Sequence, residues 1–310
     1  MNQSATADLV RRKSAAKREA NVNSSNYNEL RNSDDSISPA HSTIFSPNAE
    51  KARAEKFFLI WAAIWISMVF YIVYSQWFET FTPYHYLTFG LLLFIFPTVF
   101  PMAFPTLFLS AHLPLSRRYT TKANIYMGIL SWIANYFWTH YFYVVLHATY
   151  TFKAHRFNEV PIALYMMTHS YFHLYHVFSS ILMRLVRRRM QTKGIARYFY
   201  IGIIVIIFSY IVAFLETFTI QHFPYYDIPD RYAMYAYGSM FYGIYFIVSF
   251  PMFARLDEEA NTWNLPQTII DALACCMIVT QLLDFWRITI GHVTNAPAAN
   301  PVHQSVPFIY

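Results

Sequence analysis

The segment YFYIGIIVIIFSYIVAFLETFTI, residues 198–220, decides the fold class. Glu216 is its one charged residue, and apolar side chains occupy nearly every direction around a helix of 3.6 residues per turn. A helix of this length crosses the roughly 30 Å of hydrocarbon in a bilayer. The segment therefore predicts a membrane-spanning helix.

The rest of the chain has the same character. Its 310 residues are 56% hydrophobic, 20% aromatic and only 13% charged, which is typical of membrane proteins. Runs of about 20 residues with almost no charge lie at 57–75, 86–109, 123–147, 160–183, 198–220, 235–253 and 268–290. We predict an all-α polytopic bundle of seven transmembrane helices, or six if the 86–109 run, broken by Pro97, Pro101 and Pro105, does not cross fully.

The distribution of Lys and Arg predicts the orientation. If the N-terminus is cytosolic, the cytosolic side holds nineteen Lys and Arg residues: nine in the tail, three in the 110–122 loop, six in the 184–197 loop and one in the 254–267 loop. The other side holds four, and an excess of Lys and Arg marks the cytosolic side. The net charge of +6 then reflects topology, and we expect no nucleic-acid partner. The run Arg184–Arg189 is the strongest single anchor, and Asp257 and Glu258 are expected to hold their loop or to meet Arg255.

Composition also predicts the domain organisation. Residues 1–50 are rich in Ser, Asn and charged side chains, so we expect a disordered cytosolic tail. A transmembrane catalytic domain is expected at 51–292, and a flexible C-terminal tail at 293–310.

Ionisable side chains inside spans are candidate functional groups, because insertion disfavours them by a few kcal/mol. Helical rise places Glu216 roughly 6 Å, His140 roughly 10 Å and His169 roughly 14 Å inside the membrane from one side. Tyr225 and Asp227, in the FPYYDIPDR segment, are expected to cap that side. These groups are predicted to share one cavity.

Other polar groups have simpler interpretations. Asp284 and Arg287, three residues apart on one helix, are expected to form a structural ion pair. His169, His173 and His176 follow one helix face at a spacing that could bind a metal. The chain lacks the paired-histidine box of membrane di-iron oxidases, so we predict no metal.

Several motifs together resemble the cycloeucalenol cycloisomerase family. The likeness runs in order from about residue 57 to 291. It is carried by NYFWTHYF (135–142), YTF (150–152), TH (168–169), YH (175–176), ETFTIQHFPYYDIPDRYAMY (216–235), FYGIYFIVSFPMFARLDEE (241–259), DA (271–272) and LDFWR (283–287).

The resemblance implies a sterol-pathway isomerase of the endoplasmic reticulum membrane. Its reaction opens the 9β,19-cyclopropane ring of a sterol such as cycloeucalenol and gives the Δ8 sterol obtusifoliol, with no cofactor. A membrane di-iron oxidase and a non-enzymatic sterol-binding protein are the alternatives. The oligomeric state is left open.

That chemistry needs an acid, a base and a site that stabilises a carbocation. We expect Glu216, coupled to His140 or His169, to donate the proton, and one of these groups or a relay through Tyr225 or Asp227 to accept the other. Aromatic π faces can stabilise a cation. Substrate binding is assigned to Trp138, Tyr141, Tyr175, His176, Tyr226 and Tyr245.

Overall fold

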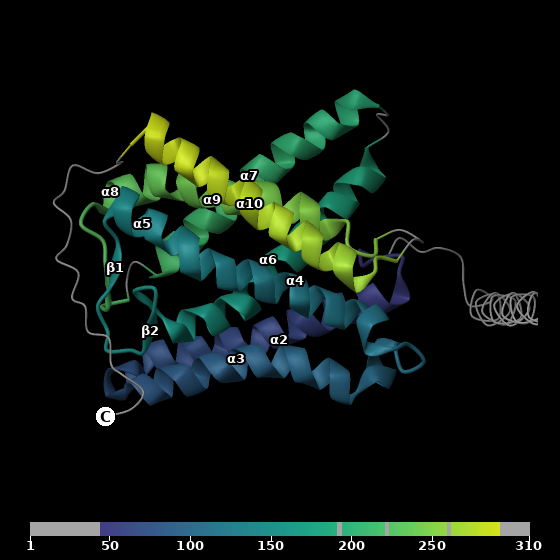
Figure 1. Cartoon of the computed structure of the whole chain (residues 1–310), viewed down its shortest axis with the longest axis horizontal. Helices are drawn as coiled ribbons and strands as arrows, with labels where there is room; N and C mark the ends of the chain where they lie inside the picture. The colour runs from purple at the N-terminus through teal and green to yellow at the C-terminus, as the bar shows by residue number, and fades with distance from the viewer. Residues whose placement is uncertain (1–43, 191–193, 221–222, 259–261, 292–310) are drawn as a thin grey trace, which may run out of the picture. The chain divides into compact units, whose positions relative to one another are not determined.

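The computed structural model describes residues 44–190, 194–220, 223–258 and 262–291. The predicted tails lie outside these ranges, apart from residues 44–50. The described part is mostly helical and forms a bundle (Figure 1).

The helices follow the apolar runs of the sequence. The α-helices are α2 (Ala49–Tyr74), α3 (Pro83–Ala103), α4 (Tyr119–Ile133), α5 (Thr139–Leu146), α6 (Ile162–Arg189), α7 (Ile195–Ile220), α8 (Arg231–Ala233), α9 (Ser239–Ala254) and α10 (Leu265–Thr289). The π-helical segments η4 (Ala134–Trp138) and η5 (Met234–Gly238) join α4 to α5 and α8 to α9. Short 3₁₀ turns are η1 (Trp77–Thr80), η2 (Pro105–Phe108) and η3 (Leu115–Arg117).

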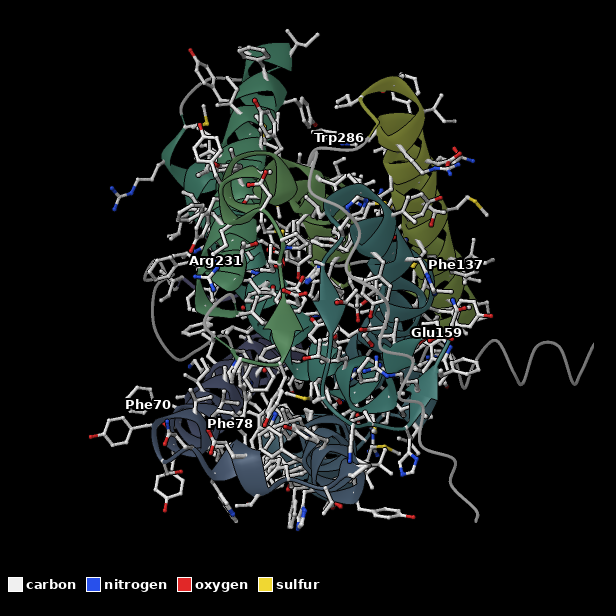
Figure 2. All side chains as sticks on the ribbon, turned by 90° about the vertical axis from the view of Figure 1, so that its left-hand side faces the viewer. Phe70, Phe78, Phe137, Glu159, Arg231 and Trp286 are labelled. Atoms are coloured by element: carbon white, nitrogen blue, oxygen red, sulfur yellow. The ribbon has the colours of Figure 1, made fainter. Side chains whose placement is uncertain are left out.

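Five helices within the described ranges are long and apolar enough to cross a membrane: α2, α3, α7, the α8–η5–α9 run and α10. Side chains such as Phe70 on α2 point away from the bundle, where lipid would lie (Figure 2). The other two predicted runs, 123–147 and 160–183, fall on the α4–η4–α5 run and on α6. The total of seven transmembrane helices and the cytosolic position of the N-terminus stay predictions.

Helix α6 is less apolar than its neighbours because it lies inside the bundle. It packs against α2, α3, α4, α7 and α9. Its buried side chains include histidines and serines, which form hydrogen bonds to these neighbours. Protein neighbours, and not lipid, therefore satisfy many of its polar groups.

The proline-rich run forms one helix up to Ala103 and then breaks. Pro97 and Pro101 lie inside α3, and each lacks the N–H that would bond the carbonyl four residues before it. The freed Leu93 carbonyl accepts a hydrogen bond from Ser170 of α6, and the freed Pro97 carbonyl accepts one from Asn124 of α4 at 3.1 Å. Side chains of neighbouring helices thus compensate the prolines.

Gly90 sets the distance between α3 and α6. A Cβ at this position would lie 2.9 Å from the Ala163 carbonyl oxygen, a backbone atom that cannot rotate away. We expect Gly90→Ala to lower the free energy of unfolding by roughly 1–3 kcal/mol, the usual cost of overpacking. Gly202→Ala is the matched control, because nothing lies within 4 Å of the Cβ it would add. Thermal unfolding of both variants in detergent checks this, and equal midpoints would refute the close contact.

A buried ion network closes one end of the bundle, which we name the basic end and define by Lys51, Lys122 and Arg184. Arg184 Nη2 lies 2.7 Å from Glu55 Oε1, and Arg184 Nε lies 2.6 Å from Glu258 Oε1. Lys51 Nζ lies 2.8 Å from Glu258 Oε2. All of these side chains are at most 15% exposed.

Asp257 belongs to the same end. It forms an ion pair with Lys122, and both side chains are buried. Of the two alternatives expected for Asp257 and Glu258, an ion pair with Arg255 is not formed, because Arg255 pairs with Asp271 at 2.6 Å, whereas Asp257 does hold its loop by accepting from the Trp263 backbone N–H. Arg184, expected to be a surface anchor, is 5% exposed and links α6 to α2 and to the loop after α9.

Two pairs of short strands organise the opposite end. β1 (Thr149–Tyr150) pairs antiparallel with β4 (Tyr226–Asp227), so that Tyr150 lies opposite Tyr226. β2 (Arg156–Phe157) pairs with β3 (Val160–Pro161). The β1–β4 pairing holds the loop after α5 against the loop after α7, and it brings two tyrosines to the bundle interior.

Candidate active site

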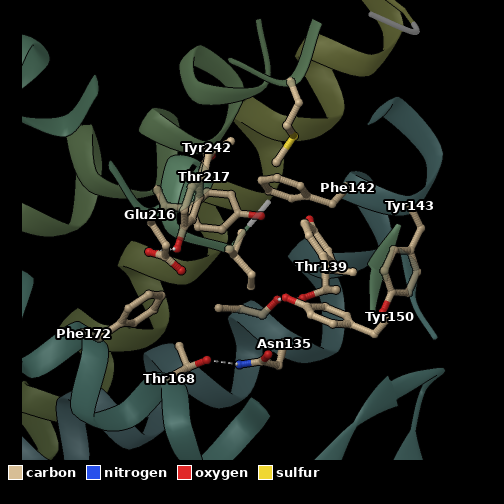
Figure 3. A pocket seen from close by; sticks show the side chains of 15 residues that line it. Asn135, Thr139, Phe142, Tyr143, Tyr150, Thr168, Phe172, Glu216, Thr217 and Tyr242 are labelled. Carbon is tan, nitrogen blue, oxygen red and sulfur yellow. Dashed lines mark hydrogen bonds between the residues drawn. The ribbon is translucent and has the colours of Figure 1, made fainter. Parts of the chain in front are cut away.

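A cavity of about 90 Å³ lies where α5, α6, α7 and α9 meet the β1–β4 pair (Figure 3). Its wall combines one carboxyl group with hydroxyl and aromatic side chains. The lining residues are Ala134, Asn135, Thr139, Phe142, Tyr143, Tyr150, Thr168, Phe172, Glu216, Thr217, Ile220, Tyr226, Met234, Tyr242 and Tyr245.

Glu216 is the one acidic side chain among these lining residues. It stands near the end of α7, on the side of the helix that packs against α9. The Tyr242 hydroxyl of α9 donates to Glu216 Oε2 at 2.7 Å, and Tyr175 of α6 lies near this carboxyl group. The Tyr242 hydroxyl therefore fixes the orientation of the carboxyl group at the cavity wall (Figure 3).

Three lining hydroxyls have no hydrogen-bond partner within the described part of the chain. They belong to Tyr143, Thr217 and Tyr245, and their oxygens are shielded from solvent. A buried polar atom without a partner costs about 1–3 kcal/mol, so such atoms are normally satisfied by a ligand or by water. The cavity thus offers polar groups to a bound molecule.

Both π-helical segments border the cavity. Ala134 and Asn135 come from η4, and Met234 comes from η5. Asn135 donates to Thr168 Oγ1 of α6 at 3.0 Å, which fixes one wall. Single π-helical turns inside α-helices occur frequently at functional sites. Their presence on two different helical runs beside one cavity supports the choice of this site.

Aromatic rings form much of the remaining wall. The Tyr242 and Tyr245 ring centroids are 4.8 Å apart, and Phe142 lies edge-on to Tyr242 at 5.4 Å. Tyr150 and Tyr226, brought together by the strand pair, are 4.6 Å apart. Ring faces attract cations, so this wall can stabilise a positive charge that develops inside the cavity.

The predicted acid–base groups do not all meet here. His140 Nε2 donates to the Asn158 carbonyl at 2.7 Å and does not line the cavity. Tyr225 packs edge-on against Phe78, and Asp227 is exposed at the strand pair, so neither lines it. Of the five residues predicted from the sequence to be catalytic, Glu216 alone does.

The three histidines on one face of α6, His169, His173 and His176, form hydrogen bonds outside the cavity. His169 Nε2 and His173 Nε2 both donate to Asn124 Oδ1, at 2.9 and 3.3 Å. His176 donates from Nδ1 to the Phe172 carbonyl and accepts from Ser249 through Nε2. No group of three or more His, Cys, Asp or Glu side chains in the described ranges is arranged to hold a metal ion.

Of the residues assigned to substrate binding, some line the cavity and others lie behind its wall. Tyr226 and Tyr245 line the cavity, and Tyr175 contacts Glu216. Trp138 supports Tyr245, with ring centroids 4.6 Å apart, and donates to Thr280 Oγ1. His176 is fully buried and does not line the cavity. Tyr141 lies beside Asp284 and does not line the cavity. Asp284 forms the expected ion pair with Arg287, at 2.9 Å.

Sequence reasoning missed several wall residues, above all Tyr242. This tyrosine lies in the quoted FYGIYFIVSFPMF motif, one helical turn before Tyr245 in an aromatic run. The sequence does not say which ring of such a run faces a distant glutamate. The missed residues also include Phe142, Tyr143, Tyr150, Phe172 and Thr217.

Comparison with known proteins adds one relative. A curated protein named cycloeucalenol cycloisomerase, from Arabidopsis thaliana, is 39% identical over 265 residues, which are 84% of this chain and 94% of that protein. No family model matches the chain. No solved structure matches it.

Proposed function

Because the chain belongs to the cycloeucalenol cycloisomerase family, a family of sterol isomerases, we propose that it opens the 9β,19-cyclopropane ring of a cycloeucalenol-type sterol. The product is the Δ8 sterol obtusifoliol. The proposal places the enzyme in the endoplasmic reticulum as a multi-pass membrane protein.

The observation that carries the mechanism is the position of Glu216. Its carboxyl group lies at the cavity wall, in a helix otherwise free of charge after Arg197. A carboxyl group in apolar surroundings retains its proton more readily, and in that form it is a general acid. The Tyr242 hydroxyl at 2.7 Å then stabilises the carboxylate that remains after proton transfer.

The reaction balances with one proton in and one proton out. Glu216 delivers a proton to C19, the C9–C19 bond breaks, and positive charge develops at C9. Loss of the proton at C8 places the double bond between C8 and C9. The Glu216 carboxylate accepts that proton, directly or through the Tyr242 hydroxyl, and is ready for the next turnover.

The aromatic wall and the free hydroxyls have separate roles in this scheme. Phe142, Tyr242 and Tyr245 line the same cavity as the carboxyl group and stabilise the cation. The unpartnered hydroxyls of Tyr143 and Thr217 bind polar groups of the sterol or ordered water. A cavity of about 90 Å³ is smaller than the roughly 300–1,000 Å³ of ligand pockets, so the proposal requires the helices around it to move apart when a sterol enters.

Conversion of the sterol tests the function directly. The full chain is expressed in membranes of a yeast strain that lacks this activity, cycloeucalenol is supplied, and sterols are separated by gas chromatography with mass detection. We expect obtusifoliol without added NADPH or iron. Recovery of unchanged cycloeucalenol from membranes that contain folded protein would overturn the assignment.

A further inference from the structure

A second, larger cavity lies at the basic end and has no place in the isomerisation. It measures about 490 Å³ and opens between the end of α6, the start of α7 and the loop after α9. Its wall includes the arginines Arg187, Arg197 and Arg255, together with Tyr198, Glu258 and Trp263. Such a wall does not suit an apolar sterol.

The positive charge of this cavity exceeds its negative charge. Glu258 is already bound by Arg184 and Lys51, and Arg255 is paired with Asp271. Neither Arg187 nor Arg197 forms an ion pair with a residue of the described ranges. Two guanidinium groups of the wall are therefore left without a carboxylate partner there.

The two arginines are also held close to one another. Arg197 Nη2 donates to the Arg187 carbonyl at 3.0 Å, which ties the first turn of α7 to the last turns of α6. Because both guanidinium groups line the same cavity, an anion bound there is attracted by both of them. A guanidinium group can donate two parallel hydrogen bonds to two oxygens of one phosphate group, because its planar geometry matches that of the phosphate.

Another part of the wall, Trp263, is held in place by the buried ion network. The backbone N–H of Trp263 donates to Asp257 Oδ1 at 2.8 Å, and Lys122 Nζ donates to the backbone carbonyl of Trp263 at 3.0 Å. The Arg255 guanidinium lies 5.7 Å from the Trp263 ring centroid. The wall thus combines Trp263, held by two hydrogen bonds, with Arg187 and Arg197, which have no ion-pair partner in the part of the chain that the structure describes.

We propose that this cavity binds the phosphate group of an anionic ligand through Arg187 and Arg197. Its volume falls in the range of ligand pockets. It lies beside the start of α7, where tyrosines and a basic run mark the predicted membrane surface, and basic pockets at that level bind anionic lipid headgroups. A free phosphate compound would present the same chemistry.

The test uses the full chain purified in a neutral detergent and native mass spectrometry. The probes are phosphatidic acid, phosphatidylcholine as the zwitterionic reference, and inorganic phosphate as competitor. Arg187→Gln and Arg197→Gln are each expected to weaken phosphatidic acid binding about fivefold, and the double variant about 25-fold. Arg189→Gln is the matched control, because it removes the same charge from an exposed position of α6 outside the cavity.

The outcomes separate the sources of the phosphate. Tight binding of phosphatidic acid that inorganic phosphate does not displace identifies a lipid headgroup. Displacement by inorganic phosphate identifies a free phosphate compound, and both results support the site. Equal loss in Arg189→Gln, equal binding of phosphatidylcholine, or no binding of any probe by folded protein would overturn it.

Discussion

Glu216→Gln is expected to lower kcat about 10²- to 10⁴-fold while the protein folds normally, because the amide keeps the shape of the side chain but cannot donate the proton. The amide oxygen can still accept from Tyr242, so the contact that orients this position is retained. Sterol turnover in membranes with matched protein levels measures the effect. A variant within fivefold of the parent would rule out Glu216 as the acid.

Asp284→Asn is the matched control for that experiment. Asp284 is also an acid on a predicted span, but it is 40% exposed, pairs with Arg287 and does not line the cavity. We expect its turnover to stay within about twofold of the parent. Equal losses in both variants would point to a general effect of removing charge from the bundle.

Arg184→Met is expected to lower the free energy of unfolding by roughly 3–5 kcal/mol, because it leaves Glu55 and Glu258 as buried carboxylates without their main partner. Thermal unfolding in detergent, or the amount of protein retained in membranes, measures the loss. Arg189→Met, an exposed substitution on the same helix, should change the midpoint by less than about 2 °C. Equal stability of the two variants would show that the network does not hold this end together.

Acid should weaken the same network. Burial alone would raise the pKa of Glu258, but the hydrogen bonds and charges of Arg184 and Lys51 outweigh it and lower this pKa below its ordinary value. A carboxyl group with a lowered pKa stabilises the fold above the pKa of the unfolded chain, about 4.3, and that stabilisation is lost as the pH falls through the folded-state pKa. The difference in stability between the parent and Arg184→Met should therefore shrink below about pH 4.

The five long apolar helices could be predicted from the sequence because each is a run of apolar residues long enough to cross a membrane. Residues 198–220 fall within α7, and residues 268–289 of the predicted run 268–290 fall within α10, which begins three residues earlier, at Leu265. Where α3 ends could not be predicted, because a proline breaks a helix or is tolerated according to which neighbours satisfy the freed carbonyl. Ser170 and Asn124 do so for Leu93 and Pro97, and both come from other helices.

The candidate site could be predicted in part. Glu216 is recognisable because an acid inside an apolar run is costly to insert into a membrane and marks a functional position there. Depth along the membrane groups His140 and His169 with it, but depth does not specify the direction in which a side chain points around its helix. From the sequence, topology alone accounts for the charges at the basic end. The pairing of Arg184 with Glu55 joins residues 129 positions apart, and the pattern of residues does not predict such a contact.

Transfer of hydrogen from the protein to C19 is the most direct test of the mechanism. The enzyme, in excess over cycloeucalenol and equilibrated in D₂O so that the Glu216 carboxyl group carries deuterium, is allowed a single turnover. Mass spectrometry and NMR then locate the label in the sterol. Obtusifoliol with one deuterium in the C19 methyl group is the predicted result, whereas an unlabelled C19 methyl group would contradict proton delivery by an acidic side chain.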